Sequence, residues 1–420
     1  MCSEFTEAIA SAQPGFDFVS AHFRCEENLY SQENPTGYVN FGSAQNYLHS
    51  QTLADLLAST HFDAEDVHYQ SFAGTADCRA AIAAYLSDLA NESTSHTGQN
   101  VHVTADQIIV GNGIISVLEA LAIALLDPDE KVLVPTPVFP GLVNALRLRV
   151  PSDVHFLHTR PEDDFRLTPE LLERELALQA SNQRIRAVLL CSPGNPIGQV
   201  FSHEQLKRFL AVAKRHGCAL IVDEIYAGSC FEGVEFVSAL RLSDDDLYVL
   251  GGLSKDFGFA GFATGWLHGT NPDVMRAVAK QAHFFRLPAP VQRVIQQVLS
   301  PGYRKPFLAA HQQMLTQRYE TAGRALADAG VPIASSDAGL CVWLDLRAHL
   351  PEADQASELE LYQYLLDEHR VHISPSSGFL TPHRGFYRIC FSHEQSLLAE
   401  GLRRIRTGLA SWSAEAVSAA

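Results

Sequence analysis

The stretch Gly251–Gly265, which reads GGLSKDFGFAGFATG, places one lysine, Lys255, in a loop rich in glycine. The loop follows the apolar run Tyr248-Val249-Leu250, which is typical of a buried strand. Glycine lets a backbone and a ligand approach closely, and a lysine in such a loop differs from one in the charged pattern of a solvated helix. The segment predicts a reactive amine at Lys255, and an ordinary turn lysine is the alternative.

Apolar runs alternate with helical patterns around this loop, from about residue 105 to residue 270. The runs are Ile108–Val110, Val132–Val134, Ala187–Cys191, Ala219–Val222, Leu247–Leu250 and Trp266–Leu267. Such alternation predicts the α/β class, with a mostly parallel sheet and helices on both of its faces. In sheets of this kind ligands bind at the carboxyl ends of the strands, where this chain has Asn195, Asp223 and Lys255.

The pattern changes after Pro301. A long helix is predicted over residues 307–329, then a strand over 340–344, a second helix over 358–369 and a last strand over 386–391. We therefore predict three regions: an N-terminal arm over residues 1–50 that forms part of a smaller domain, a large α/β domain over residues 51–300, and a small C-terminal α+β domain over residues 301–420.

Composition limits the classes of function. The chain has 420 residues, of which 46% are hydrophobic and 19% charged, which suits a soluble globular protein with an extensive core. Its net charge of −17 and its lack of a lysine and arginine cluster argue against nucleic acid or an anionic membrane as a partner. No apolar stretch has the length of a membrane span, and the N-terminal segment lacks the basic residues of a targeting signal.

The eight cysteines are scattered and form no CxxC pair. Several lie in apolar runs, where a free thiol packs as a small hydrophobic side chain. We therefore predict reduced, structural cysteines, a cytoplasmic protein and no metal site.

Two segments before the lysine loop carry polar groups suited to a ligand. The turn Ser192–Gly198 leaves the amide of Asn195 at the edge of the sheet, where it can donate to a ligand oxygen, although such turns are common. In the run VDEIY, Asp223 ends an apolar strand and Tyr226 follows three residues later. A buried carboxylate needs a partner, and a protonated ring nitrogen would serve; a helix N-cap at Asp223 is the alternative.

A fourth segment, Tyr387–Ser392, reads YRICFS and places Arg388 among residues typical of a strand. A guanidinium in that setting suits two-pronged recognition of a carboxylate. A strand arginine on the surface is the alternative.

In this order and spacing the four segments resemble the class I aminotransferase branch of the pyridoxal phosphate enzymes, and the resemblance covers nearly the whole chain. Within that branch, two sequence motifs are most similar to those of the 1-aminocyclopropane-1-carboxylate synthases. The stretches that carry this are Asn34–Asn46, NPTGYVNFGSAQN, and Leu133–Pro137, LVPTP, with Pro140-Gly141. The resemblance implies fold type I, with a seven-stranded, mostly parallel sheet, pyridoxal phosphate as cofactor, and a homodimer whose sites lie at the subunit interface.

The resemblance also implies roles for individual residues. Lys255 forms the Schiff base and acts as general base, Asp223 pairs with the pyridine nitrogen, and Arg388 holds the substrate carboxylate. The other implied cofactor contacts are Tyr226 and Asn195 on the ring hydroxyl, Phe139 stacked on the ring, and Gly113, Ile114 and Ser254 around the phosphate. On the substrate side the resemblance implies Gln45, and Phe72 and Arg286 from the partner subunit, with ordinary helix packing as the alternative for Arg286.

The chain departs from this family where the phosphate group would bind. Phe72, Ile115, Gly252 and Ala263 stand where the family has a tyrosine, a threonine, a serine and an arginine. A charge-assisted hydrogen bond contributes roughly 1.5–3 kcal/mol, so four absent donors remove several kcal/mol of phosphate affinity. Gln45 stands where the cyclopropane-forming relatives have a glutamate, and an amide cannot act as a base. We therefore expect an amino-acid transformation other than the cyclisation of S-adenosylmethionine, in specialised metabolism.

Three explanations of these departures stay open. In the first, pyridoxal phosphate still binds, and a relocated cation such as Arg286 or Lys280 reaches its phosphate from the partner subunit. In the second, Lys255 acts directly on a carbonyl substrate as an iminium or enamine catalyst. Its cavity would then be apolar and lined by Phe72, Ile114, Ile115 and Phe139, and burial there would lower the pKa of the lysine. In the third, the protein is a non-catalytic scaffold.

Overall fold

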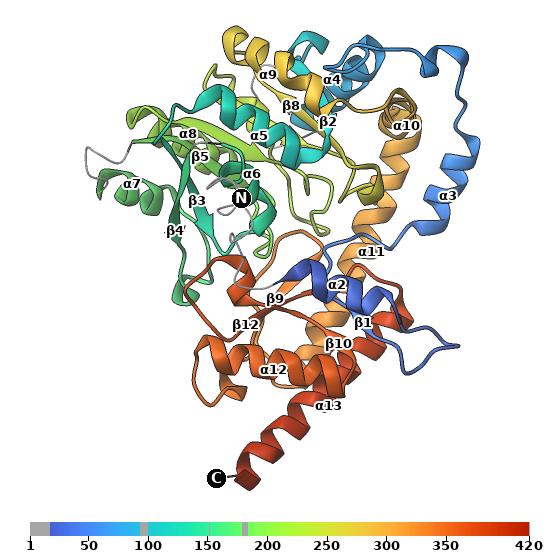
Figure 1. Cartoon of the computed structure of the whole chain (residues 1–420), viewed down its shortest axis with the longest axis vertical. Helices are drawn as coiled ribbons and strands as arrows, with labels where there is room; N and C mark the ends of the chain where they lie inside the picture. The colour runs from blue at the N-terminus through green and yellow to red at the C-terminus, as the bar shows by residue number, and fades with distance from the viewer. Residues whose placement is uncertain (1–16, 93–99, 151, 179–183, 420) are drawn as a thin grey trace, which may run out of the picture.

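The computed structural model describes residues 17–92, 100–150, 152–178 and 184–419. Its centre is a seven-stranded sheet in the order β2-β8-β7-β6-β5-β3-β4 (Figure 1). The strands are β2 Ile108–Asn112, β3 Lys131–Thr136, β4 Asp153–His158, β5 Ile185–Cys191, β6 Ala219–Asp223, β7 Leu247–Gly251 and β8 Thr264–His268. Only β8 runs antiparallel to its neighbours in this sheet. The predicted α/β class and mostly parallel sheet are confirmed.

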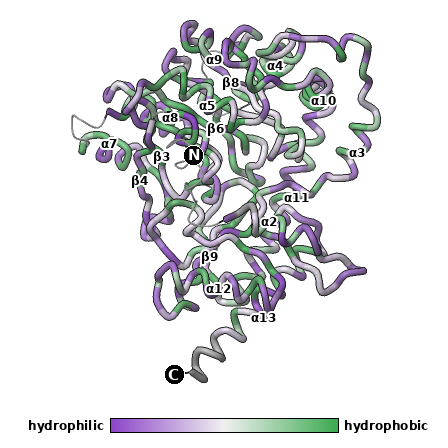
Figure 2. The backbone as a smooth tube through the Cα atoms, viewed as in Figure 1, coloured by the Kyte–Doolittle hydropathy of each residue, from purple (hydrophilic) through white to green (hydrophobic). Residues whose placement is uncertain are grey.

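The central strands are hydrophobic on both faces because helices cover both faces. Every residue of β6 is buried, and so is every residue of β7. Within β6, Ala219 and Ile221 pack into one core, whereas Leu220 and Val222 pack into the other. Much of this central layer is coloured as hydrophobic in Figure 2. Uninterrupted apolar runs are therefore the sequence signal of these strands.

Two groups of helices sandwich the sheet. Helices α5 (Gly113–Leu125), α6 (Pro140–Arg147) and α9 (Pro272–Phe285) contribute to the first core. The second core receives α4 (Ala76–Asn91), α7 (Pro169–Leu178), α8 (His203–Arg215) and α10 (Ala289–Leu299). Helix α3 (Ser50–Ser59) lies at the side of the molecule in Figure 1.

A second structural unit occupies the lower part of Figure 1. It holds the antiparallel sheet β11-β12-β9 and the parallel pair β1-β10. The strands are β1 Val39–Asn40, β9 Cys341–Asp345, β10 Val371–His372, β11 Ser374–Pro375 and β12 Phe386–Cys390, and the helices are α2 Phe18–Glu26, α11 Pro301–Asp328, α12 Gln355–Glu368 and α13 Gln395–Ala419. Because β1 pairs with β10, the N-terminal segment lies beside the C-terminal one. The division at residues 50 and 300 stays a prediction.

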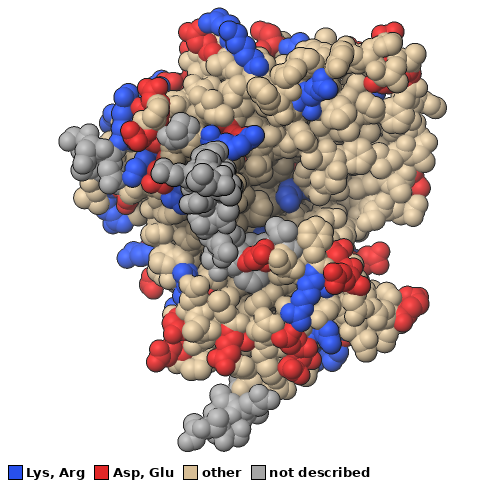
Figure 3. All heavy atoms as spheres, viewed as in Figure 1, with Lys and Arg blue, Asp and Glu red and all other residues tan. Residues whose placement is uncertain are grey.

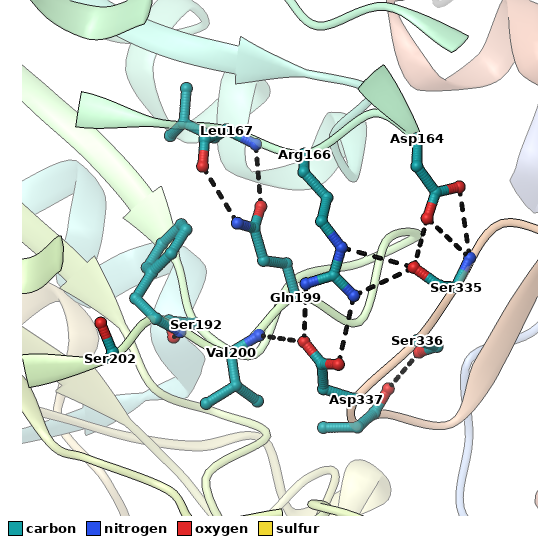
Figure 4. Close-up of polar contacts among 12 residues, drawn as sticks. Asp164, Arg166, Leu167, Ser192, Gln199, Val200, Ser202, Ser335, Ser336 and Asp337 are labelled. Atoms are coloured by element: carbon teal, nitrogen blue, oxygen red, sulfur yellow. Dashed lines mark hydrogen bonds and ion pairs between the residues drawn. The ribbon is translucent and has the colours of Figure 1, made fainter. Parts of the chain in front are cut away.

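A polar cluster joins the two parts next to the site (Figure 4). Arg166, on the loop after β4, donates to both carboxylate oxygens of Asp337 at 2.9 and 3.1 Å. The Ser335 backbone N–H donates to Asp164 at 3.0 Å, and the Val200 backbone N–H donates to Asp337 at 3.2 Å. The chain leading into β9 is therefore fixed to the loop that follows β5.

Candidate active site

Three of the predicted polar residues follow neighbouring parallel strands. Strand β6 pairs in parallel with both β5 and β7, so the carboxyl ends of the three strands lie at one edge. Asn195 follows β5, Asp223 ends β6 and Lys255 follows β7. Figure 3 shows the face of the molecule that is seen in Figure 1. A hollow lies near its middle, between the upper and lower parts of the molecule, and basic atoms are visible inside it.

The amine of Lys255 is held inside the site. Its Nζ donates to the backbone oxygen of Ala44 at 2.6 Å, and the side chain is half-buried. Burial is the main reason that the pKa of Lys255 lies below its usual value; the charge of Arg388 lowers this pKa further, and Asp223 opposes the shift. The Asn46 amide donates to the backbone oxygen of Lys255 at 3.0 Å, which fixes the loop. This setting favours a reactive amine over an ordinary turn lysine.

Asp223 is a buried acid without a cationic partner. Its carboxylate is 3% exposed, accepts the Ile225 backbone N–H at 3.1 Å, and forms no ion pair with any residue in the described ranges. No helix begins there, so the N-cap alternative is wrong. Burial raises the pKa of Asp223 to about 7, because the ionised form is poorly solvated. A cation bound beside it would restore the charged form.

A hydrogen-bonded chain links the two structural units through Asn195. The Asn195 amide donates to the Tyr226 hydroxyl oxygen at 3.2 Å, and the Arg388 guanidinium donates to the Asn195 amide oxygen at 3.2 Å. Arg388 also donates to the backbone oxygen of Gly42 and lies 4.9 Å from the ring centroid of Phe379. Arg388 is only 2% exposed, so the alternative of a surface arginine is wrong.

The remaining predicted ring contact, Phe139, lies at the same edge of the sheet. It follows β3, which neighbours β5, and directly precedes α6. Its side chain is 37% exposed, which leaves a ring face open to a ligand. The predicted stacking role stays a prediction.

The region predicted to face the phosphate group is formed by backbone. Gly113 and Ile114 begin α5, and Ser254 is half-buried after β7. A Cβ atom at Gly265 would lie 2.4 Å from the carbonyl carbon of Gly113, so β8 packs directly on the start of this helix. A Cβ atom at Gly252 would lie 2.4 Å from the backbone oxygen of Thr264. A serine therefore cannot stand at position 252 without moving β8.

Phe72 and Arg286 lie together on the outside of the large unit. The Arg286 guanidinium carbon is 5.4 Å from the Phe72 ring centroid and 5.2 Å from that of Tyr69. These three residues border a groove of about 310 Å³, and Tyr69 is 84% exposed. Arg286 forms no ion pair with any residue that the structure describes. Its guanidinium instead lies against the rings of Tyr69 and Phe72, in cation–π contacts.

The loop Gly42–Asn46 contributes groups that sequence reasoning missed. Its backbone oxygens accept from Arg388 at Gly42 and from Lys255 at Ala44. The backbone oxygen of Gln45 accepts the Ser392 hydroxyl at 2.8 Å, and the side chain of Gln45 is half-buried. Every residue has a backbone oxygen, so the residue types of this loop do not indicate these contacts. The loop was noted in the sequence only because its residues 42–46 resemble those of the family.

Two classes of feature are not found in the described residues. Among them, no helix combines the length and apolar character that crossing a membrane requires. Within the same ranges, no cluster of three or more histidine, cysteine, aspartate or glutamate side chains is arranged to hold a metal ion.

Comparison with known proteins gives consistent matches. Residues 36–405 match the sequence profile of aminotransferase class I and II. A 1-aminocyclopropane-1-carboxylate synthase of Solanum lycopersicum is 30% identical over 81% of this chain and 72% of its own length. Another synthase, from Arabidopsis thaliana, is 28% identical over 90% of this chain and 89% of its own length. A probable aminotransferase of Arabidopsis thaliana is 29% identical over 77% of this chain and 66% of its own length.

Solved structures share the fold. The aspartate aminotransferase of Thermus thermophilus with maleate has a TM-score of 0.77 and 22% identity, covering 97% of this chain and 99% of that one. An aromatic aminotransferase of Pyrococcus horikoshii has a TM-score of 0.76 and 20% identity, covering 93% of this chain and 99% of that one.

Proposed function

The chain belongs to the family of class I and II aminotransferases, and from this premise we propose that it is a pyridoxal phosphate enzyme that transforms an α-amino acid or a related compound at Lys255. The observation that carries this proposal is the pairing of a half-buried amine with a buried acid that has no ion-pair partner among the described residues. Asp223 and Lys255 leave adjacent strands at the same edge of the sheet.

The ring end of the site fits the cofactor. Asp223 offers a carboxylate to a ring nitrogen, and burial raises the pKa of this carboxylate to about 7, which a cationic ring beside it would lower. Tyr226 and Asn195, already hydrogen-bonded to each other, offer a hydroxyl and an amide to the ring oxygen. Phe139 offers an exposed ring face. The phosphate end fits less well, since it offers the backbone N–H groups at the start of α5 and the hydroxyl of Ser254.

When bound, pyridoxal phosphate supplies an aldehyde for condensation with amines and a ring that takes up electrons released at the α-carbon. The residues of this chain supply the rest. Arg388 binds the substrate carboxylate and turns the α-carbon toward Lys255. The lowered pKa of Lys255 increases the neutral fraction of its amine, which can then take a proton from the α-carbon.

The substrate class follows from Arg388, but the reaction has three candidates. Transamination, elimination or substitution, and cyclisation each begin with the same bond at the α-carbon. Gln45 supplies no base, which disfavours the cyclisation that needs a carboxylate at this position. We propose an α-amino acid substrate and leave these three reactions as the set that product analysis has to separate.

One reductive experiment tests the proposal. Purified protein is titrated with pyridoxal phosphate, reduced with borohydride and digested, and the Lys255 peptide is weighed by mass spectrometry. We expect a visible absorption band and a phosphopyridoxyl group on Lys255. A colourless protein with an unmodified Lys255 peptide would overturn the proposal.

A second candidate is direct amine catalysis by Lys255 on a carbonyl substrate. The small number of side-chain donors in the phosphate region and the lowered pKa of Lys255 favour it. Pyruvate is a suitable probe because Arg388 selects carboxylates. Under this candidate, borohydride with pyruvate attaches a carbon adduct without a pyridoxyl group to Lys255, and pyridoxal phosphate does not compete. Failure to trap any pyruvate adduct contradicts it.

For the phosphate group we propose that two copies of the chain form a homodimer and that Arg286 of each copy serves the other copy's site. Three observations support this: Arg286 has no ion-pair partner in the described part of the chain, it stacks on Phe72 and Tyr69, and it borders an exposed groove. A guanidinium so held keeps its charge available for a phosphate.

Arg286→Met is expected to weaken the binding of pyridoxal phosphate about 10–10²-fold while leaving the binding of pyridoxal, which has no phosphate, nearly unchanged. Spectral titration with both compounds measures the difference. The matched control is Arg276→Met on helix α9, which ends one residue before Arg286; Arg276 is exposed and paired with Asp273. Equal weakening for pyridoxal and pyridoxal phosphate contradicts the role of Arg286.

A further inference from the structure

Two cysteines face each other across the small antiparallel sheet. Cys341 begins β9 and Cys390 ends β12, and the register pairs them directly. The Cys390 backbone N–H donates to the backbone oxygen of Phe41 at 2.8 Å, and not to Cys341. The backbone N–H of the next residue, Phe391, donates to the backbone oxygen of Leu340 at 2.9 Å. The two cysteines therefore form a non-hydrogen-bonded pair, in which Cα atoms are about 4.5 Å apart and side chains are closest. That separation is within the range that a disulfide spans.

The two thiols are joined to the loop that holds the lysine. They are direct partners across the sheet, and the Cys390 Sγ lies 3.1 Å from the Ser392 hydroxyl oxygen and 3.5 Å from the backbone oxygen of Gln45. The preceding carbonyl, at Ala44, accepts the amine of Lys255. Consecutive carbonyls of one loop therefore hold the thiol and the amine.

The pair favours one thiolate beside one thiol. Burial opposes ionisation of Cys390, but the polar groups of Cys341, His393 and Ser392 near its sulfur outweigh burial and hold the pKa of Cys390 well below its usual range. Burial and the hydrogen bond to Cys390 raise the pKa of Cys341. The nearby charges of Arg388 and Lys255 oppose that rise, which places both basic groups next to the pair.

We propose that Cys341 and Cys390 are a redox-active dithiol beside Lys255, which hydrogen peroxide or a related small peroxide oxidises to an intramolecular disulfide. This site goes beyond the proposed function and does not depend on a cofactor. In the described part of the chain, no other two cysteines are paired by strand register.

The reaction balances in two steps. The Cys390 thiolate attacks one peroxide oxygen, the O–O bond breaks, and a sulfenic acid and hydroxide form; the hydroxide takes up a proton equivalent to the one that the thiol released and becomes water. The sulfur of Cys341 then attacks the sulfenic sulfur, the S–O bond breaks, and a second water leaves as the S–S bond forms. Two electrons pass from the two sulfurs to the peroxide.

Oxidation changes the loop that positions the lysine. Formation of the S–S bond draws the Cys390 Sγ toward Cys341 and changes its 3.5 Å contact with the backbone oxygen of Gln45. The same loop holds Arg388 at Gly42 and Lys255 at Ala44. Oxidation is therefore expected to reduce capture of a carbonyl compound by Lys255, and reduction by dithiothreitol restores it.

The test begins with fully reduced protein without added cofactor. It is treated with stoichiometric hydrogen peroxide, alkylated with iodoacetamide, digested and analysed by mass spectrometry. We expect a Cys341–Cys390 linked peptide, two hydrogens lighter than its parts, together with a loss of two free thiols that dithiothreitol reverses. Full alkylation of both cysteines at a peroxide level that already oxidises other cysteines would falsify the proposal.

Two variants and a second probe complete the test. Cys78→Ser, a buried cysteine on α4, is expected to form the disulfide as the unchanged protein does. Cys341→Ser is expected to stop at a Cys390 sulfenic acid that dimedone traps. If that variant does not fold, phenylarsine oxide, which bridges neighbouring thiols, is applied to the unchanged protein. One equivalent bound to the Cys341 and Cys390 peptides supports the pair, and no binding overturns it. Each readout is the mass of a cysteine peptide from protein without cofactor. The result of this test therefore does not depend on whether the protein binds pyridoxal phosphate.

Discussion

Replacing Lys255 with alanine is expected to lower turnover of any amino-acid substrate by at least about 10²–10⁴-fold, because the variant loses both the amine that holds the carbonyl group and the base at the α-carbon. The visible band of the cofactor-loaded protein should disappear as well. A small primary amine such as methylamine should restore part of the turnover, since the cavity left by the side chain can admit it. Turnover, absorption and rescue are measured on the same preparation.

The control for this variant is Lys214→Ala on α8. Lys214 is about half exposed and forms a surface ion pair with Asp244, and a pair of this kind contributes little to stability. This variant is expected to keep full turnover. Unchanged turnover in folded Lys255→Ala would contradict a catalytic role for Lys255 and would assign the reaction to another group.

The strands and the edge where the site lies follow from sequence because their signals are local. The residues of β5 after Arg186 and those of β6 and β7 are nearly continuous apolar runs, and parallel neighbours bring their carboxyl ends together, which predicts Asn195, Asp223 and Lys255 as one group. β4 was missed because its sequence, DVHFLH, alternates polar and apolar residues at the edge of the sheet, where only two of its side chains are buried. Edge strands give a weaker hydrophobic signal than central ones.

The contacts that complete the site could not be predicted from residue type. Lys255 bonds to the main chain of Ala44, and Arg388 reaches Asn195 from a different sheet. Both contacts depend on how the two structural units pack, which no local pattern encodes. The cysteines show the same limit, because a search for CxxC detects neighbours in sequence, whereas the antiparallel register of β9 and β12 brings Cys341 and Cys390 together.

In the phosphate region, a missing side chain cannot be restored by a single substitution, because backbone atoms fill the space that the side chain would need. Gly252 and Gly265 lie against backbone atoms of Thr264 and Gly113. A side chain at either position would separate β8 from its neighbours, so a serine placed at 252 would not rebuild the family's phosphate contact. Because the local donors are few, the proposed role of Arg286 from the partner subunit is the informative one to test.

Replacing Asp223 with asparagine is expected to lower turnover about 10²-fold, the upper end of the roughly 1.5–3 kcal/mol that a charged hydrogen bond contributes. Burial raises the pKa of Asp223 to about 7, so its carboxylate becomes mostly ionised as the pH rises from about 6 to about 8. A cationic ring binds the ionised form, so the affinity of the unchanged protein for pyridoxal phosphate should rise over this interval. The amide cannot ionise, and the ratio of the two affinities, measured by spectral titration at each pH, isolates the contribution of Asp223.

Glu224→Gln is the matched control for Asp223→Asn, because the neighbouring carboxyl is equally buried and bonds instead to Ser238 and the Ala239 backbone N–H. Burial raises the pKa of Glu224 to about 8, so near pH 7 it is mostly protonated and an amide replaces a neutral group with a neutral group. The control should therefore keep the pH dependence of cofactor binding. If Asp223→Asn keeps that dependence too, the titrating group is not Asp223, and the carboxylate does not serve the ring nitrogen.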